Sequence, residues 1–216
     1  MAIIAQDTFS VDSDTPLENH TPDIGTGWNN TTFTCEADDD SVRVEGTAIE
    51  VASELTDIGS DEMKISLDYT VIRLSSDGRI GVAARIPSGE TGESNSEQAY
   101  FLGDGTTVGL VLDQVVATVR VNLGTYDADL TQADLPKKIT LQALDASTKV
   151  LLDDVEVIST ATVVLDDNNF GGICGQRGVV RGDNYLSESI DAPAPPAATV
   201  TPGQIRKKRL MTGVGL

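Results

Sequence analysis

The chain has 216 residues, of which 34 are acidic and 15 are basic, so its formal net charge is −19 at pH 7. A field of that sign repels nucleic acid and anionic membrane surfaces, and we expect neither as a partner. Hydrophobic residues make up 39% and aromatic residues 4%, so the core must consist mainly of Val, Ile, Leu and Ala. A β-sandwich of this length commonly forms a single domain.

No stretch of the sequence predicts membrane insertion or export. The apolar runs stay below the ~18 residues that a transmembrane helix needs. The N-terminal segment MAIIAQDTF lacks the basic region and the long apolar region of a secretory signal. We therefore expect neither a membrane anchor nor a secretory signal.

The first 28 residues predict an edge strand followed by an ordered loop. Ala2-Ile3-Ile4 is apolar and predicts a short edge strand or arm. The segment from Asp7 to Trp28 is rich in Asp, Thr, Pro and Gly, which favour turns. Three apolar residues of this loop, Phe9, Leu17 and Trp28, are its expected anchors in the core.

Short strands separated by turn residues are expected from residue 32 to residue 190. Polar and apolar residues alternate from Lys64 to Val71, which predicts a half-buried strand. Asp77-Gly78 predicts a tight hairpin turn, whereas residues 87–98 and 127–138 predict polar loops. The expected strands cover residues 2–4, 32–35, 41–45, 47–52, 63–74, 79–86, 99–102, 107–113, 115–123, 139–143, 149–157, 160–165 and 172–174, with a last strand from 183. About 12 to 14 strands with hardly any helical signal favour an all-β sandwich.

A domain boundary is expected at Asp191, so residues 1–191 form the sandwich and residues 192–216 an arm. The segment APAPPAA at 192–198 favours an extended polyproline conformation and cannot build a core. Four basic residues in a row follow at 206–209, and then an apolar end. The arm can bind nucleic acid, stay solvated or dock on an acidic partner or a second copy, and we favour docking.

The two cysteines, Cys35 and Cys174, are far apart in the sequence and have no CxxC partner, which argues against a zinc site. Buried free thiols are favoured over a disulfide between them. No cofactor is expected. Calcium is the one ion considered, because Asp166, Asp167 and Asn168 offer hard oxygen ligands, although acidic turns are more often only solvated.

The stretch from Phe170 to Ile190, FGGICGQRGVVRGDNYLSESI, predicts a short strand, a polar turn and a final strand that begins at Asp183-Asn184-Tyr185. It resembles the closing strands of the concanavalin A-like (laminin G-like) jelly roll. The opening loop and the phrase G-x-x-A-R from Gly81 to Arg85 match the same family in the same order. The resemblance covers roughly residues 5–190 and implies a jelly-roll sandwich of two antiparallel sheets.

No catalytic residue is predicted. Glycoside hydrolases of this fold use a Glu-x-Asp-x-Glu strand, whose alternate carboxylates face one side of a cleft, and the sequence contains no such triplet. His20 is the only histidine, and its neighbours Pro22 and Asp23 match the family's opening loop, which favours a structural role. We therefore expect a protein without enzymatic activity.

The domain is also similar to stand-alone concanavalin A-like proteins of bacteriophages. That resemblance implies a virion structural protein, made in the host cytoplasm and placed on the virion surface, with capsid decoration as the favoured role. Its partners would be viral capsid or tail proteins and further copies of the chain. The expected docking contacts are Ile3, Ile4, Arg206, Lys207, Lys208, Arg209, Leu210 and Leu216. The alternative is a carbohydrate-binding, lectin-like module of a tail fibre or surface adhesin, which would bind a host glycan.

Overall fold

The computed structural model describes most of the chain between Met1 and Ile190. The described residues are 1–10, 15–29, 35–37, 40–44, 50–71, 78–89, 95–103, 108–162, 165, 168–176 and 181–190. Their regular structure is almost entirely β, with two short 3-10 helices at Leu17–Asn19 (η1) and Gln132–Asp134 (η2). Among them no helix is long and apolar enough to cross a lipid bilayer. The predictions for the arm at 192–216 and for the turn at Asp77 lie outside this part of the chain.

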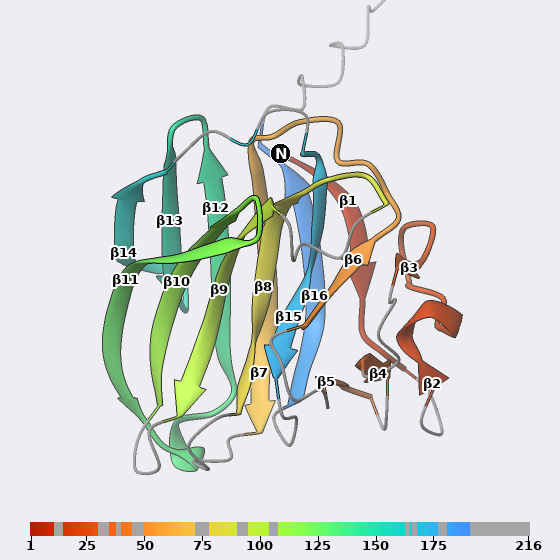
Figure 1. The fold of residues 1–216 in the computed structure, drawn as a ribbon. Coiled ribbons are helices and arrows are strands. Elements are labelled where there is room, and N and C mark those ends of the chain that lie inside the picture. The colour runs from red at the N-terminus through yellow and green to blue at the C-terminus, as the bar shows by residue number, and fades with distance from the viewer. Residues whose placement is uncertain are drawn as a thin grey trace, which may run out of the picture.

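Nine strands form one antiparallel sheet, which lies behind the other sheet in Figure 1. Its order is β14-β13-β12-β7-β16-β5-β4-β2, and β1 pairs with β16 beside this path. The strands are β1 (Ala2–Asp7), β2 (Thr15–Pro16), β4 (Cys35–Ala37), β5 (Val42–Val44), β7 (Met63–Val71), β12 (Lys137–Leu144), β13 (Ser147–Leu152), β14 (Val155–Ala161) and β16 (Arg181–Ser189).

Seven strands form the second antiparallel sheet, in the order β11-β10-β9-β8-β15-β6-β3. The edge strand β11 of this sheet and the edge strand β14 of the first lie on the same side of the sandwich (Figure 1). The strands are β3 (Trp28–Asn29), β6 (Glu50–Glu54), β8 (Arg79–Ile86), β9 (Asn95–Gly103), β10 (Val108–Val116), β11 (Val119–Leu130) and β15 (Phe170–Gln176).

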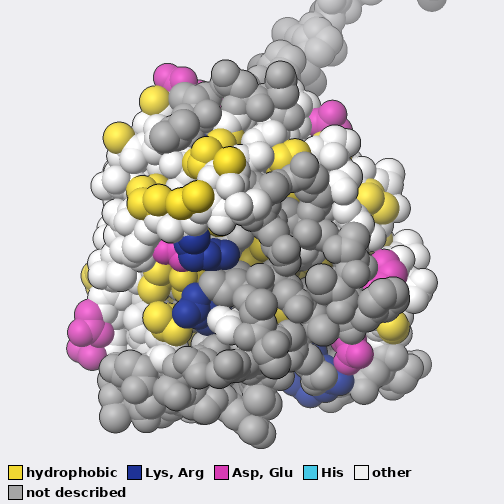
Figure 2. Space-filling view, viewed as in Figure 1, with side chains coloured by type: hydrophobic (Ala, Val, Ile, Leu, Met, Phe, Trp, Pro, Cys, Tyr) yellow, Lys and Arg dark blue, Asp and Glu magenta, His cyan; other side chains and the backbone are white. Residues whose placement is uncertain are grey.

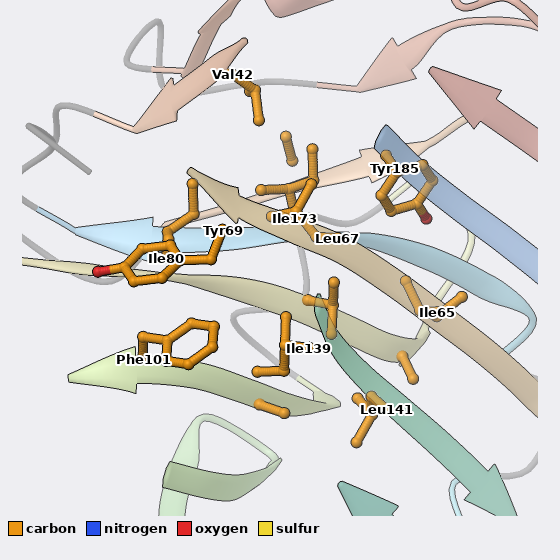
Figure 3. Packing of buried hydrophobic residues seen from close by; sticks show 14 of the residues in the cluster. Val42, Ile65, Leu67, Tyr69, Ile80, Phe101, Ile139, Leu141, Ile173 and Tyr185 are labelled. Atoms are coloured by element: carbon orange, nitrogen blue, oxygen red, sulfur yellow. The ribbon is translucent and has the colours of Figure 1, made fainter. Parts of the chain in front are cut away.

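The main core lies between the two sheets and is built from their inward-facing side chains. In β7 the alternation predicted from Lys64 to Val71 is confirmed, because Ile65, Leu67 and Tyr69 are all buried. Figure 3 shows these side chains directed toward residues of the opposite sheet. The Tyr69 ring stacks on the Phe101 ring with centroids 4.2 Å apart. Such a core buries mostly aliphatic surface, which supplies the main driving force for folding.

One predicted strand is wrong because a hairpin turn interrupts it without a glycine. Residues 115–123 were expected to form one strand, but they contain the turn between β10 and β11. Ala117 and Thr118 occupy the turn with φ of 50° and 69°. A turn of this kind needs positive φ at both central residues, which Asn and Gly adopt most readily. Ala and Thr give no such signal in the sequence.

Three other boundaries also differ from the prediction. The expected strand 149–157 is two strands, because Asp153 and Asp154 form a turn with φ of 49° and 66°. The expected loop 87–98 ends at Asn95, where β9 begins, and the expected loop 127–138 starts only after β11 ends at Leu130. The polar start of β9 misled the prediction, because its polar side chains pair inside the protein instead of facing water.

Arg85 joins the two sheets at one end of the sandwich. Its side chain is fully buried, and its Nη1 donates to Glu97 Oε1 in β9 at 3.1 Å. Its Nε donates to the Asp61 carbonyl before β7, and its Nη2 donates to the Asp145 carbonyl in the β12–β13 turn. Thr148 in β13 donates to the other Glu97 oxygen. A buried charge is tolerated only when it is paired and fully hydrogen-bonded, and this pair meets both conditions.

Replacing Arg85 should therefore destabilise the fold more than replacing any exposed cation. In Arg85→Met, Glu97 stays buried without its charge partner, and we expect a loss of about 3 kcal/mol in the free energy of unfolding. The double variant Arg85→Met/Glu97→Gln should regain part of that loss, because no charge is left buried. Urea unfolding measures both, with Lys149→Met, which breaks an exposed pair, as the control. A double variant no more stable than the single one contradicts this account.

Candidate functional site

The outer face of the seven-stranded sheet carries polar side chains that sequence reasoning did not single out. In β9, Ala99 and Phe101 point into the main core, so Tyr100 between them points out of the sandwich. The cross-strand register places Tyr100 beside Val111 of β10. The same register places Gln98 beside Asp113, Asp113 beside Asn122, and Arg79 beside Leu102.

These residues form a connected hydrogen-bond network around Asp113. Tyr100 Oη donates to Asp113 Oδ2 at 2.6 Å, and Asn122 Nδ2 donates to Asp113 Oδ1 at 3.0 Å. Arg120 Nη1 donates both to Asp113 Oδ2 at 3.1 Å and to Gln98 Oε1 at 2.8 Å. Asp113 is only 3% exposed. With three donors around it, this carboxylate serves as a fixed acceptor that orients its neighbours.

Arg79 at the start of β8 joins the network from the other side. Its Nη1 donates to Tyr100 Oη at 3.2 Å, and its guanidinium carbon lies 5.1 Å from the centre of the Tyr100 ring. Burial, together with the hydrogen bond to Asp113, raises the pKa of Tyr100, so the phenol stays protonated and donates. Figure 2 shows basic side chains beside apolar ones on this face of the molecule.

A shallow hollow of about 230 Å³ adjoins the network along β9, β10 and β11. Thr125 faces this hollow from β11 because it pairs with Val111 of the outer face, whereas Tyr126 pairs with Leu110 of the main core and directs its side chain to the other face of the sheet. The hollow meets the network at Leu102, the cross-strand neighbour of Arg79, and at Val111, the neighbour of Tyr100. Its lining residues are Leu102, Gly109, Leu110, Val111, Thr125, Tyr126 and Asp127. We call the network and this hollow together the outer-face site.

Gly81 allows β8 and β9 to approach closely enough to seat Tyr100. A Cβ atom on Gly81 would lie 1.9 Å from the Ala99 carbonyl oxygen and 2.4 Å from Tyr100 Cα. Those distances are far inside van der Waals contact, so only glycine fits at this position. The phrase from Gly81 to Arg85 therefore has two structural roles. Gly81 leaves room for the β9 backbone at Tyr100, and Arg85 joins the two sheets through its hydrogen bonds.

A second buried cluster lies under the opening loop. Asp7 accepts hydrogen bonds from the Phe9 backbone N–H and from Trp28 Nε1, and its Oδ1 lies 2.8 Å from His20 Nε2. Phe9, Leu17 and Trp28 are buried, so the predicted anchors are confirmed. His20 is 8% exposed and bound to Asp7, which fits the predicted structural role.

Glu54 extends this cluster deeper into the protein. It is 2% exposed, and its carboxyl accepts hydrogen bonds from the Gly171 backbone N–H at 3.1 Å and from Ser187 Oγ at 2.8 Å. Burial raises its pKa to about 7, against the opposing effect of these hydrogen bonds. Glu54 lines neither the hollow described above nor the one on the nine-stranded sheet, and its carboxyl already accepts two hydrogen bonds, so we assign it to stability.

A hollow of about 280 Å³ on the nine-stranded sheet is lined by Lys64, Lys138 and Asp68, and both of these lysines are already paired with carboxylates. Lys64 pairs with Glu188 at 3.0 Å, and Lys138 pairs with Asp154 at 2.8 Å. The predicted docking residue Ile3 lines this hollow. Since its cations already have carboxylate partners, this hollow offers a ligand less than the outer-face site does.

The residues predicted as sites lie elsewhere. Ile3 is 50% exposed on β1 and Ile4 is packed against the core, both on the nine-stranded sheet. Asn168 is described, whereas Asp166, Asp167 and the arm residues lie outside the described part. Within the described ranges no three His, Cys, Asp or Glu side chains converge as metal ligands.

Cys174 lies in β15 among the apolar residues of the outer face. Its thiol is free and fully buried, as predicted, and burial raises its pKa to about 12. The Cys35 side chain lies outside the described part of the structure. Cys174 and its neighbours Val51, Ala83 and Val111 give the outer face an apolar layer beside the polar network.

Comparison with known proteins shows the fold. The sequence matches no protein-family model and no curated protein. A Bacillus subtilis protein of unknown function with a galectin-like fold is similar at a TM-score of 0.57 and 11% identity, over 88% of this chain and 96% of that chain. The Bacillus licheniformis β-glucanase is similar at 0.56 and 9% identity, over 83% and 99%. The carbohydrate recognition domain of Emp47p is similar at 0.54 and 10% identity, over 86% and 97%.

The chain has a concanavalin A-like jelly-roll fold. The predicted fold class, two antiparallel sheets in one sandwich, is thereby confirmed. Identities near 10% show the fold alone, so what these proteins bind or cleave is not transferred by the comparison. The similarity to bacteriophage virion proteins stays a prediction.

The buried Glu54 of this jelly roll should make its stability depend on pH. Its pKa is about 7 in the folded protein against 4.5 ordinarily. The folded state therefore binds the extra proton between these values, and stability falls as pH rises from 4.5 to 7, by up to about 3 kcal/mol. Glu54→Gln removes the ionisable group; its Oε1 can still accept from the Gly171 N–H, and its Nε2 donates to Ser187 Oγ instead of accepting from it. The variant should therefore flatten this dependence and be the more stable protein at pH 8.

Chemical unfolding at pH 5, 6.5 and 8 measures the effect. The exposed Glu156→Gln, which removes a surface carboxylate, is the matched control and should keep the wild-type slope. If Glu54→Gln also keeps that slope, Glu54 is already ionised in the folded protein and the assignment is wrong.

Proposed function

We propose that this jelly roll is a non-enzymatic carbohydrate-binding domain that takes a glycan at the outer-face site. The observation that carries the proposal is the combination of an open hollow on the outer face with a prebuilt hydrogen-bond network next to it. Apolar lining with a few convergent polar groups is the usual composition of a small-ligand site. The Emp47p carbohydrate recognition domain supports the proposal as a precedent for the fold.

The groups at the site suit the two kinds of surface that a sugar presents. Leu102 and Val111 offer an apolar surface for sugar C–H groups, and Thr125 offers a hydroxyl beside it. Arg120 and Asn122 are exposed enough to donate to sugar hydroxyls, and Asp127 can accept from them. Since Asp113 already fixes Arg120 and Asn122, little side-chain entropy remains to be lost on binding.

The chemistry of the network favours binding over hydrolysis. Glycoside hydrolysis needs one carboxyl group that gives a proton and a second that acts as nucleophile or base. Asp113 is buried and accepts three hydrogen bonds, so it has neither a proton to give nor a free face with which to attack. The β-glucanase shows that the fold itself accommodates hydrolysis, so this argument rests on Asp113 and not on the fold.

Filling the hollow should abolish most of the binding. Thr125 lines the hollow and pairs with the outer-face residue Val111, so we expect Thr125→Trp to block it and to weaken glycan affinity roughly tenfold or more. The best ligand from an immobilised oligosaccharide array is titrated by calorimetry against wild type and variant. Val155→Trp places the same ring at an exposed position on β14 and should bind normally. Unchanged affinity in Thr125→Trp places the glycan elsewhere.

Capsid decoration is the second proposal, and exposed apolar residues at the N-terminus favour it. Ile3 is 50% exposed and Met1 is 76% exposed, on a strand that pairs with β16. Such a strand can add to a neighbouring subunit through its apolar contacts and main chain. On this proposal, the N-terminal strand and the arm at 192–216 hold the domain on a viral particle or on a further copy.

The decoration proposal predicts an assembly that depends on its terminal contacts. Light scattering should give an oligomer for the full chain and a smaller mass for the chain without residues 192–216, with unchanged thermal unfolding. Ile3→Asp should lower the mass in the same way. If all three proteins are monomers of equal stability, these contacts do not assemble the chain with itself.

A further inference from the structure

We infer that the glycan bound at the outer-face site is acidic, and that Arg79 and Arg120 bind its carboxylate or sulfate group. This inference rests on the proposed function, because it names the ligand class of the same site. It is carried by the charge balance of the network, by the incomplete hydrogen bonding of Arg79 and by the contrast with the other cations of the protein.

The network contains two guanidinium groups but only one carboxylate. Arg120 pairs with Asp113 at 3.1 Å. Arg79 has no carboxylate within 4.0 Å among the described residues, and its hydrogen-bond partner is the neutral phenol of Tyr100. Because Asp113 compensates only one of the two cations, the network keeps one positive charge beside the hollow, whose lining includes the carboxylate of Asp127.

The Arg79 guanidinium also has more N–H donors than it has hydrogen-bond acceptors among the described residues. Nη1 donates to Tyr100, whereas Nε is buried and has no hydrogen-bond partner. An unsatisfied buried donor lowers stability, so its presence needs an explanation. A ligand that supplies oxygen atoms to this guanidinium explains why the protein retains Arg79 in this state.

Arg120 binds Asp113, the acceptor of the hydrogen bond from Tyr100. Arg79 donates to the Tyr100 end of the Tyr100–Asp113 pair, and Arg120 donates to the Asp113 end. The Arg120 side chain is 32% exposed, and the network uses only its Nη1. The two guanidinium groups are therefore held at the same Tyr100–Asp113 hydrogen bond, and each keeps N–H donors that the network does not use.

The lysines of the nine-stranded sheet differ from Arg79, because each of them is paired with a carboxylate. The protein carries a net charge of −19, which gives its cations an excess of carboxylates to pair with. Every lysine that the structure describes has a carboxylate within 3.0 Å; these are Lys64, Lys137, Lys138 and Lys149. Arg79 has no such partner among the described residues, even though the chain is strongly acidic.

A guanidinium group is matched to the carboxylate of a uronic acid or to a sulfate ester. Its planar fork donates two parallel hydrogen bonds to either group, and these charge-assisted bonds are stronger than bonds to a neutral hydroxyl. A neutral sugar would cover the Arg79 charge without compensating it, which costs binding energy. The site should therefore prefer an acidic polysaccharide over a neutral one of the same shape.

The test compares ligands that differ in charge alone. Calorimetry on the full chain uses an oligogalacturonate and its methyl ester, and a sulfated galactan oligosaccharide and its desulfated form. We expect one of the two acidic ligands to bind at least tenfold more tightly than its neutral counterpart. Which pair shows the difference tells carboxylate from sulfate recognition.

Variants assign the preference to the two arginines. Arg79→Gln and Arg120→Gln should each reduce the preference for the acidic ligand at least tenfold, whereas Arg79→Lys should keep part of it. Lys149→Gln on the other sheet removes the same charge and should change nothing. Thermal unfolding confirms that each variant is folded, and the exposed Arg120→Gln provides the test should Arg79→Gln unfold.

The outcomes separate this inference from the proposed function. Equal affinity for acidic and neutral ligands overturns the acidic preference but leaves a carbohydrate-binding domain. A preference for acidic ligands that survives both glutamine variants overturns the role of the arginines. If none of these ligands nor any glycan on the array binds, the proposed function fails as well.

Discussion

The buried ion pair between Arg85 and Glu97 fixes the register of β9, and the position of the outer-face site depends on that register. Arg85 ties β8 and β9 to the segment before β7 and to the β12–β13 turn, so it fixes one sheet against the other. Glu97 is followed along β9 by Gln98 and Tyr100, which belong to the outer-face site. A strand that carries an internal ion pair and a surface network must keep one register, because a slip by one residue exchanges its two faces.

The seven-stranded sheet is unusual in having apolar residues buried on both faces. Its inner face belongs to the main core, while Val51, Ala83, Ile86, Tyr100, Val111 and Cys174 form a second buried cluster on its outer face. In a sheet with one solvent-exposed face, apolar and polar residues alternate along each strand, but β8 is apolar nearly throughout. The polar network interrupts this apolar layer, which restricts solvent around its charges and strengthens their interactions.

The sequence predicted those parts of the fold in which a local pattern carries the information. Alternation marked β7 because only one of its faces is apolar, and the anchors Phe9, Leu17 and Trp28 stood out in a polar loop. The β10–β11 turn was not predicted because Ala117 and Thr118 adopt positive φ, although neither is a residue typical of such turns. Such a turn is imposed by the pairing of the strands and not by its own two residues.

The site was beyond the reach of sequence reasoning for a different reason. Arg79, Tyr100, Asp113 and Arg120 come from four strands, and only the register of these strands brings them together. No spacing along the chain encodes that arrangement. The one local signal was Asp113 itself, a charged residue inside the apolar run VGLVLDQVV, which is unexpected in a strand unless the charge has partners.

Because β11 lies at the edge of its sheet, some parts of the site can accept amino-acid substitutions more readily in evolution than others. Arg79, Tyr100 and Asp113 of the network lie on the central strands β8, β9 and β10, where a substitution disturbs a neighbour on each side. Thr125 and Asp127 lie on a strand that pairs only with β10 within its sheet, beyond the network residues Arg120 and Asn122 of the same strand. On the proposed function, descendants of this protein can therefore vary residues 125–127 and acquire new glycan preferences, while the network inherited from their ancestor stays intact.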